Sequence, residues 1–210
     1  MILAVVLWGF VVAAGTLYGL WYETTPAVTS GAVTHWPESS SCQLSAEVPT
    51  LLMFVHPRCP CSRASLNELA LLMTHCQGKV DTQVLFLRPT VEPDNWAQTD
   101  LWKSAERIPG VIPQGDFDGA EHRRFGAKAS GEVFLFQPDG TLSFHGGITS
   151  GRGHEGDNPG RLSVERLLLA GDSAVQGTPV FGCQLECPGS TASELSGREP
   201  SPATNLSEPR

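Results

Sequence analysis

The chain has 210 residues, a formal net charge of −8 and a pI near 5.2, with 17% charged and 40% hydrophobic residues. This length suits one domain of ordinary size with flanking segments, and the hydrophobic content excludes a disordered polyanion. Only 14 residues are Lys or Arg, so we expect no nucleic-acid partner, because such proteins need a basic surface to neutralise phosphates. No phosphate-binding loop, dinucleotide fingerprint or HExxH motif occurs, and we expect no cofactor.

The first 22 residues carry no charged side chain. As a helix rising ~1.5 Å per residue, they would span roughly 33 Å, close to the ~30 Å hydrocarbon core of a bilayer. Tyr18, Trp21 and Tyr22 gather at the distal end, where an interfacial aromatic belt belongs. The alternatives are a buried core helix and a cleaved signal peptide, but the run is apolar all round and lacks a basic n-region. We predict an uncleaved anchor over residues 1–22, with the folded domain on the extracytoplasmic, periplasmic side.

Composition divides the rest of the chain into three parts. Residues 23–46 are rich in Thr, Ser, Pro and Ala and predict a tether. Residues 188–210 have almost no large apolar side chain and predict a disordered tail. The folded domain is therefore expected over residues 47–187.

Within the domain, hydrophobic patterning predicts alternating strands and helices. The first strand is a continuous apolar run that ends at a proline, which is typical of a strand buried on both faces. A Pro-Asp-Gly turn near the end of the domain predicts a hairpin. The expected elements are strands at 50–57, 80–89 and 111–117, helices at 60–75, 95–107 and 120–125, a hairpin within 132–148 and a closing helix at 163–170. This order predicts an α/β fold: a central mixed sheet flanked by helices, with an antiparallel pair at one side.

The stretch HPRCPCSR places Cys59 and Cys61 between the end of the first strand and the start of a helix. A thiol at a helix N-terminus meets free backbone N–H groups and the positive end of the helix dipole, which favour the thiolate. Pro60 suits the first helical position, and Arg58 and Arg63 add positive potential. The sequence therefore predicts a reactive thiolate at Cys59.

These residues resemble the active-site turn of the thioredoxin-like superfamily, in which a strand ending in an aromatic residue and a proline leads to Cys-x-x-Cys and a basic residue. Arg63 keeps the basic position, whereas Ser62 takes the place of the second cysteine and Cys61 lies one residue early. The stretches CPCSRASLNEL and GITSGRGHEGDN resemble the membrane-anchored bacterial redoxins of the RedB type. The resemblance implies a thioredoxin-like fold over residues 51–170, with protein thiols or disulfides as substrates.

Two features depart from the superfamily pattern. A disulfide across Cys-Pro-Cys closes a smaller ring than one across Cys-x-x-Cys, so it is expected to be strained and easily reduced. The superfamily also carries a cis-proline before the hairpin, facing the reactive cysteine, and Gly131 stands at that place. Glycine still permits the close backbone approach that a mixed disulfide needs.

Together these patterns predict a thiol-disulfide oxidoreductase in which Cys59 attacks, Cys61 resolves the mixed disulfide, and Arg58 and Arg63 lower the pKa of Cys59. A peroxidase is disfavoured, because His56 stands where peroxidases carry Thr or Ser. Two alternatives stay open: a copper-binding or delivery module that holds Cu(I) on the same thiolates, and a non-catalytic interaction domain with this fold.

A second polar cluster, SGRGHEGDN, follows the last strand of the hairpin at residues 150–158. The resemblance puts this loop at the active-site end of the sheet. His154 could then donate or accept a proton during thiol exchange, with Glu155 or Asp157 setting its tautomer. The alternative is a turn whose polar side chains bond their own backbone before Pro159.

The remaining cysteines allow several pairings. Cys183 and Cys187 follow the last helix, and the intervening chain is long enough to return them to the active site as resolving cysteines. A structural bridge between these two, or with Cys42, is the alternative. Cys76 lies on the apolar face of the first domain helix and is expected to be a packing residue.

Overall fold

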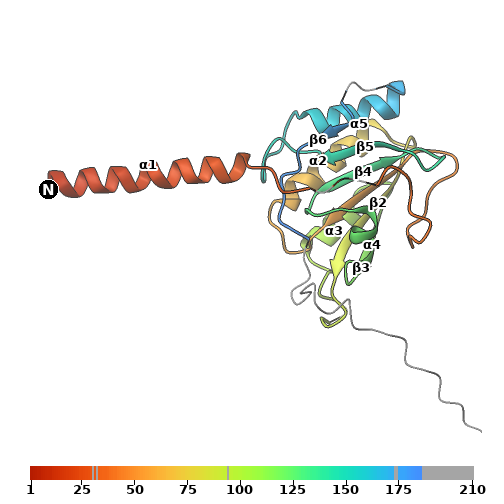
Figure 1. The fold of residues 1–210 in the computed structure, drawn as a ribbon, viewed down its shortest axis with the longest axis horizontal. Helices are drawn as coiled ribbons and strands as arrows, with labels where there is room; N and C mark the ends of the chain where they lie inside the picture. The colour runs from red at the N-terminus through yellow and green to blue at the C-terminus, as the bar shows by residue number, and fades with distance from the viewer. Residues whose placement is uncertain (30, 32, 94, 173–174, 186–210) are drawn as a thin grey trace, which may run out of the picture.

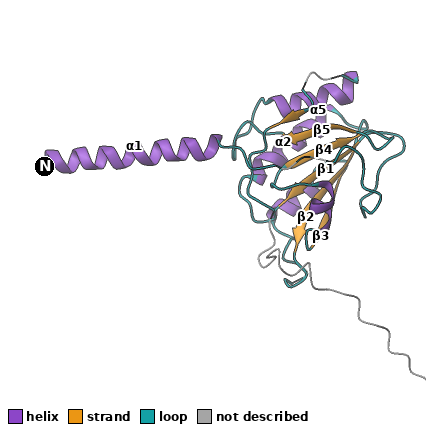
Figure 2. Cartoon of the chain, viewed as in Figure 1, coloured by secondary structure: helices purple, strands orange, loops and turns teal. Residues whose placement is uncertain are grey.

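The structure is a computed structural model that describes residues 1–29, 31, 33–93, 95–172 and 175–185. A central sheet of six strands has the order β3-β2-β1-β4-β5-β6, with helices against both of its faces (Figures 1 and 2). The strands are β1 (Thr50–Val55), β2 (Asp81–Arg88), β3 (Val111–Phe117), β4 (Glu132–Phe136), β5 (Leu142–Gly147) and β6 (Gly177–Thr178). The helices are α1 (Ile2–Thr24), α2 (Ser62–His75), α3 (Asp100–Glu106), α4 (Ala120–Phe125) and α5 (Pro159–Ala170).

Strand β1 is the centre of the sheet and is buried along its whole length. It pairs parallel with β2 and antiparallel with β4, and β4 continues into the antiparallel strand β5. Side chains alternate across a strand, so β1 contributes to two cores. Leu51, Met53 and Val55 pack with α2, α3 and α5, whereas Leu52 and Phe54 pack with α4 on the other face. This arrangement confirms the predicted mixed α/β, thioredoxin-like fold.

Residues 33–44 lie within the predicted tether and pack on the α4 face of the sheet. The Trp36 ring meets Phe125 and Phe136 edge to face, at centroid distances of 5.1 and 5.2 Å. Ser40 and Ser41 donate hydrogen bonds to the buried carboxylate of Glu121. This part of the segment therefore completes the second core, although its overall composition is typical of a linker.

Helix α1 extends away from the sheet (Figure 1), and none of its residues is buried. It is 23 residues long, and a stretch of 18 residues within it has a mean hydropathy of 2.0, which is sufficient by length and composition to cross a membrane. Its distal end is attached to the domain, because the Arg152 amide donates to the Glu23 carbonyl and the Ala27 amide to the Val180 carbonyl. The predicted anchor is thus a separate helix that ends beside the domain.

The other predicted elements form with small changes at their ends. Helix α3 begins at Asp100 rather than near residue 95, because the residues before it form turns that bury Trp96. Helix α5 begins at Pro159, where the Asn158 side chain accepts a hydrogen bond from the Arg161 amide and caps the first turn. The two-residue strand β6 was not expected. The predicted tail, residues 188–210, and Cys187 lie outside the described residues.

Candidate functional site

The loop between β1 and α2 positions the two cysteines of the Cys-Pro-Cys motif. The Cys59 amide donates to the His56 carbonyl at 3.1 Å, and the Ser62 amide donates to the Cys59 carbonyl at 3.2 Å. These bonds wind the chain into consecutive tight turns that lead into α2, and Cys61 is the residue that precedes its first turn. The structure therefore places Cys59 at the strand-to-helix junction expected from the sequence.

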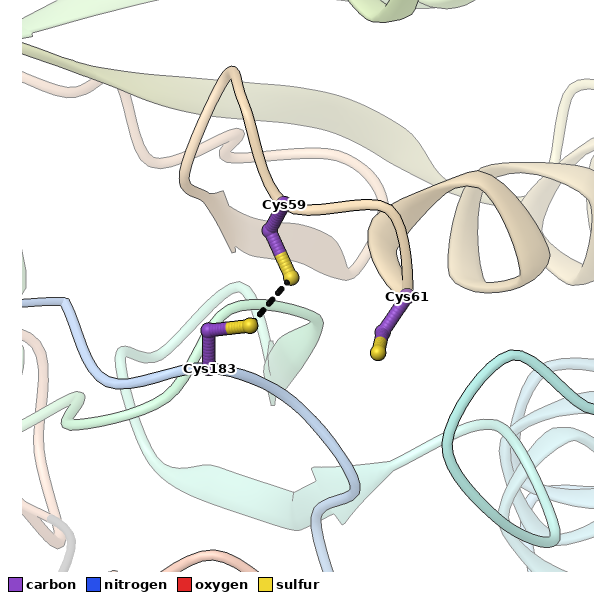
Figure 3. Close-up of side chains that lie close together, drawn as sticks. All are labelled: Cys59, Cys61 and Cys183. Atoms are coloured by element: carbon purple, nitrogen blue, oxygen red, sulfur yellow. Dashed lines mark hydrogen bonds between the residues drawn. The ribbon is translucent and has the colours of Figure 1, made fainter. Parts of the chain in front are cut away.

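Three thiols meet at this junction. The sulfur atoms of Cys59, Cys61 and Cys183 all lie within 4.8 Å of one another. Figure 3 shows the thiols of Cys59 and Cys183 turned toward each other from opposite chain segments; their Sγ atoms share a hydrogen bond of 2.9 Å. Cys59 is only 2% exposed, whereas Cys61 and Cys183 are half-buried.

Cys183 is held there by backbone pairing between the C-terminal segment, residues 179–185, and the loop before β4. The Ser130 amide donates to the Cys183 carbonyl at 2.7 Å, and the Leu185 amide donates to the Lys128 carbonyl at 2.8 Å. Gly182 permits this close approach, since a Cβ at that position would lie 1.8 Å from the Ser130 carbonyl oxygen. The position of Cys183 is therefore built into the fold.

The loop before β4 is itself fixed by a buried carboxylate. Glu132 accepts hydrogen bonds from the Lys128 and Ala129 amides at 2.8 and 3.0 Å, and its other oxygen lies 2.5 Å from Nε2 of His145. Gly131, where the resemblance places a cis-proline, has a φ of +87° and donates its amide to the Phe54 carbonyl. None of the peptide bonds described for this chain is cis.

The three thiols differ in their ionisation. The hydrogen bond from Cys183 outweighs the effect of burial and, with a further bond from Ser62, lowers the pKa of Cys59 to about 4. The same hydrogen bond, followed by burial, raises the pKa of Cys183. Burial and the charge on Cys59 raise the pKa of Cys61. The cluster at neutral pH therefore holds one thiolate, on Cys59, and two thiols.

Two hydroxyl groups and a histidine complete the surroundings of Cys59. The Ser130 hydroxyl lies 2.6 Å from that of Ser62 and accepts a hydrogen bond from the His56 amide at 2.7 Å. Burial lowers the pKa of His56, an effect that the nearby charge of Cys59 opposes. The His56 ring packs edge to face on Trp96. We infer that His56 is chiefly neutral at pH 7 and shapes the wall of the site.

Arg63 and His154, the other predicted catalytic residues, make contacts that lead away from the thiols. The Arg63 guanidinium forms an ion pair with Asp100 and so links α2 to α3. The Nε2 atom of His154 lies 3.2 Å from the Glu23 carboxylate, and both side chains are about half exposed. A catalytic role for either residue stays a prediction.

Arg152 is a site residue that the sequence analysis did not single out. Its guanidinium donates to the Gly182 carbonyl, donates to the Tyr22 carbonyl at 3.2 Å, and lies over the Tyr22 ring. Its positive charge also opposes the rise in the pKa of Cys61 and Cys183. The sequence signal for it is a basic residue inside SGRGHEGDN, two positions before the titratable His154.

The rest of the 150–158 loop is held by a buried ion pair. The Glu68 carboxylate, on α2, accepts hydrogen bonds from the Gly156 amide at 2.6 Å and from the Asn158 side chain at 3.2 Å. Arg161 Nε donates to it at 2.7 Å, with both side chains of the pair buried. Asp157 forms an ion pair with the same arginine. These contacts give Asp157 and Asn158 a structural role, whereas Glu155 accepts a hydrogen bond from the Asn67 side chain on α2.

The other described cysteines are isolated from the site. Burial raises the pKa of Cys42 to about 12 and also raises the pKa of Cys76. Both are free thiols, as is Cys183, so the alternative bridge between Cys42 and Cys183 is not formed. A bridge to Cys187 lies outside the described residues.

Comparison with known proteins yields no matching family model and no matching curated protein. A hypothetical protein from Sinorhizobium meliloti is 15% identical with a TM-score of 0.58, covering 79% of this chain and 96% of that one. An uncharacterized conserved protein from Geobacillus kaustophilus is 18% identical with a TM-score of 0.57, covering 80% and 92%. A secreted disulfide oxidoreductase from Mycobacterium tuberculosis is 20% identical over 47% of this chain and 68% of that one, and its TM-score of 0.38 is too low to bear on fold or function. The first two similarities show only the fold of the chain.

Proposed function

We propose that this protein is a membrane-anchored, extracytoplasmic thiol-disulfide oxidoreductase of the RedB type, with its redox site built on the Cys-Pro-Cys motif. The observation that carries the proposal is the single favoured thiolate, Cys59, with two protonated thiols inside 4.8 Å of its sulfur. A thiolate is the nucleophile of thiol-disulfide exchange, and a neighbouring thiol is what releases a mixed disulfide.

The reaction follows from that arrangement. Cys59 attacks one sulfur of a protein disulfide, forms a mixed disulfide and expels the other sulfur as a thiolate. A second thiol of the cluster then attacks Cys59, so that the substrate leaves as a dithiol and the cluster holds a disulfide. Read in reverse, the same steps oxidise a protein dithiol.

The resemblance to membrane-anchored redoxins and the apolar helix α1 support the cellular setting of the proposal. A single N-terminal helix that can cross a membrane would hold the domain at the surface of the bilayer. An extracytoplasmic position would place the thiol cluster in a compartment where protein disulfides persist.

The proposal is tested by turnover of the full chain in detergent, with a disulfide-bonded protein as substrate and a dithiol reductant as electron source. We expect Cys59→Ser to reduce the rate to that measured without protein. The matched control is Cys76→Ala, which removes a buried thiol outside the cluster. Turnover by Cys59→Ser at the wild-type rate would overturn the proposal and leave a non-catalytic interaction domain.

Copper binding is a second candidate, favoured by the clustering of three sulfur ligands around one point. Soft thiolates select Cu(I), and Cys59, Cys61 and Cys183 could hold it together. Titrating the reduced full chain with Cu(I) against a competing chelator tests this candidate. One tightly bound copper per chain, without turnover of a disulfide substrate, would favour it over the oxidoreductase.

A further inference from the structure

We propose that Cys183, rather than Cys61, is the cysteine that forms a disulfide with Cys59 during turnover. The C-terminal segment would then supply half of the redox couple. This inference rests on the proposed oxidoreductase function and assigns its resolving residue.

The geometry around Cys59 distinguishes the two candidates. The sulfur of Cys183 already lies 2.9 Å from that of Cys59, and Figure 3 shows the two side chains opposed across the gap between their segments. Opposed segments can meet the dihedral angle of about 90° that a disulfide needs. Cys61 shares a tight turn with Cys59 and immediately precedes α2. A bond to Cys61 would close a small ring within that turn, with the strain that such rings carry.

The C-terminal segment is fixed so that Cys183 remains at this position. Backbone hydrogen bonds hold it on both sides of the cysteine: the Cys183 carbonyl accepts from Ser130, and the Leu185 amide donates to Lys128. Arg152 adds a charged donor to the Gly182 carbonyl. A reacting group held in this way acts at a high effective concentration, so Cys183 meets a mixed disulfide on Cys59 before an external thiol does.

The burial of Cys59 makes the same segment part of substrate access. Cys59 is 2% exposed, and the sulfur of Cys183 lies against it. We infer that a protein disulfide reaches Cys59 when the hydrogen bonds of the C-terminal segment open, and that their re-formation returns the resolving thiol to its position.

The exchange balances in atoms and electrons. The Cys59 thiolate attacks the substrate disulfide, and one substrate sulfur leaves as a thiolate. Cys59 then no longer carries the charge that kept the proton on Cys183, so that proton passes to the departing thiolate. The Cys183 thiolate attacks Cys59 Sγ, releases the second substrate sulfur and forms the Cys59–Cys183 bond. The substrate gains the two electrons that the cysteine pair loses, and an external dithiol restores the pair by the reverse exchange.

Disulfide mapping of the full chain in detergent tests the pairing. The protein is oxidised with oxidised glutathione, its free thiols are alkylated, and it is digested with trypsin without reductant for mass spectrometry. Trypsin leaves Cys59 with Cys61 in peptide 59–63, and Cys183 with Cys187 in peptide 167–198. We expect these two peptides to be linked in the wild type, in Cys61→Ser and in Cys187→Ser, and the link to be absent in Cys183→Ser.

Kinetics supply the second measurement. We expect Cys183→Ser to accumulate the Cys59–substrate mixed disulfide. Cys76→Ala, which removes a buried thiol outside the cluster, should turn over close to the wild-type rate. Gly182→Ala keeps the thiol but displaces its segment, so resolution should slow by about 100-fold, the cost typical of a misplaced reacting group. Circular dichroism tests whether each variant is folded. If a variant does not fold, the disulfide map of the wild type decides the pairing.

Three results would overturn this inference while leaving the oxidoreductase intact. The first is an internal disulfide within peptide 59–63, and the second is wild-type turnover by Cys183→Ser in a protein that Cys59→Ser inactivates. The third is a disulfide confined to peptide 167–198, which would remove Cys183 as the partner of Cys59. Full activity of Cys59→Ser would instead overturn the proposed function itself.

Discussion

At the scale of single residues, hydrogen bonding separates Cys59 from the other buried thiols. Cys42, Cys59 and Cys76 are all buried, and burial alone raises the pKa of a thiol. Of these three thiols, Cys59 receives a hydrogen bond from another cysteine, Cys183, and its pKa falls. The low pKa of Cys59 thus depends chiefly on one tertiary contact, the hydrogen bond from Cys183.

The first prediction concerns the ionisation of Cys59. The ultraviolet absorbance of the thiolate, taken as the difference between wild type and Cys59→Ser, should titrate with a midpoint near pH 4, against an ordinary thiol pKa of 9.0. Cys183→Ser should raise the midpoint, because it removes the main hydrogen-bond donor, and Cys61→Ser should change it little. A wild-type midpoint near 9 would contradict the assigned thiolate.

The same lowering of the pKa of Cys59 extends the first prediction to the stability of the fold. The pKa of Cys59 is lower in the folded protein than in the unfolded chain, so its ionisation stabilises the fold. That contribution is absent below about pH 4, grows as the pH rises and is complete above about pH 9. The melting temperature of wild type should therefore gain on that of Cys59→Ser as the pH rises through this window.

At the scale of elements, polar contacts fix the loops that surround the thiol cluster. Glu68 and Arg161 join α2 to α5 and hold the 150–158 loop between them. Glu132 holds the loop before β4, and Arg152 joins the C-terminal segment to the end of α1. The helices and strands form the scaffold of the domain. These few buried or half-buried charged side chains fix the conformation of the loops around the thiol cluster.

The buried ion pair gives the second prediction. Arg161→Met leaves the Glu68 carboxylate unpaired at 0% exposure, so we expect a loss of about 3–5 kcal/mol in the free energy of unfolding. Urea denaturation of the full chain in detergent measures it. The control is Arg166→Met, an exposed position on the same helix, where the change should stay within ~0.5 kcal/mol. Equal stabilities for the two variants would show that Glu68 does not depend on its partner.

Arg152 gives the third prediction. Arg152→Gln removes a charged donor from the Gly182 carbonyl and weakens the pairing of Cys183 with Ser130. Amide exchange at Ser130 should quicken by about tenfold, the effect of losing a charged hydrogen bond of ~1.5 kcal/mol. Hydrogen exchange with mass spectrometry measures it. Arg123→Gln, which removes an arginine–carbonyl contact at α4, serves as the control, and the same exchange rate in both variants would refute the role.

At the scale of the whole molecule, the thiol cluster lies at the end of the domain that meets α1. The Ala27 amide donates to the Val180 carbonyl, three residues before Cys183, and Arg152 contacts both Tyr22 and Gly182. In Figure 1 the distal end of α1 meets the domain beside the C-terminal segment. With α1 in a bilayer, the thiol cluster would therefore lie close to the membrane surface.

The anchor gives the fourth prediction. Leu7→Arg with Val11→Arg places two charges in α1, each of which costs about 2.5–3.5 kcal/mol at the centre of a membrane helix. We expect wild type to stay with the membranes in an alkaline carbonate wash and the double variant to be extracted. Leu162→Arg, on the exposed surface of α5, should remain with the membranes. Extraction of the wild type would mean that α1 does not span a bilayer.

Local sequence patterns were sufficient to predict much of the fold. The unbroken apolar run of β1, the charge-free helix α1, the hairpin at Pro-Asp-Gly and the junction that holds Cys59 all follow from neighbouring residues. The packed half of the tether did not, because Trp36 and Leu44 are isolated apolar residues in a polar stretch, and only the sheet face opposite them shows that they are buried. Likewise, β6 is too short for any periodicity to reveal.

For the site, the sequence was sufficient to predict Cys59 and Cys61, because a strand end, a proline and a helix start are neighbours there. The sequence did not determine which other thiol lies beside Cys59. Cys183 lies 124 residues away, and several pairings of the cysteines are equally compatible with the chain length. The approach of Cys183 to Cys59 depends on the close contact at Gly182, the turn at Gly131 and the arginine at 152, and these become neighbours only when the sheet assembles.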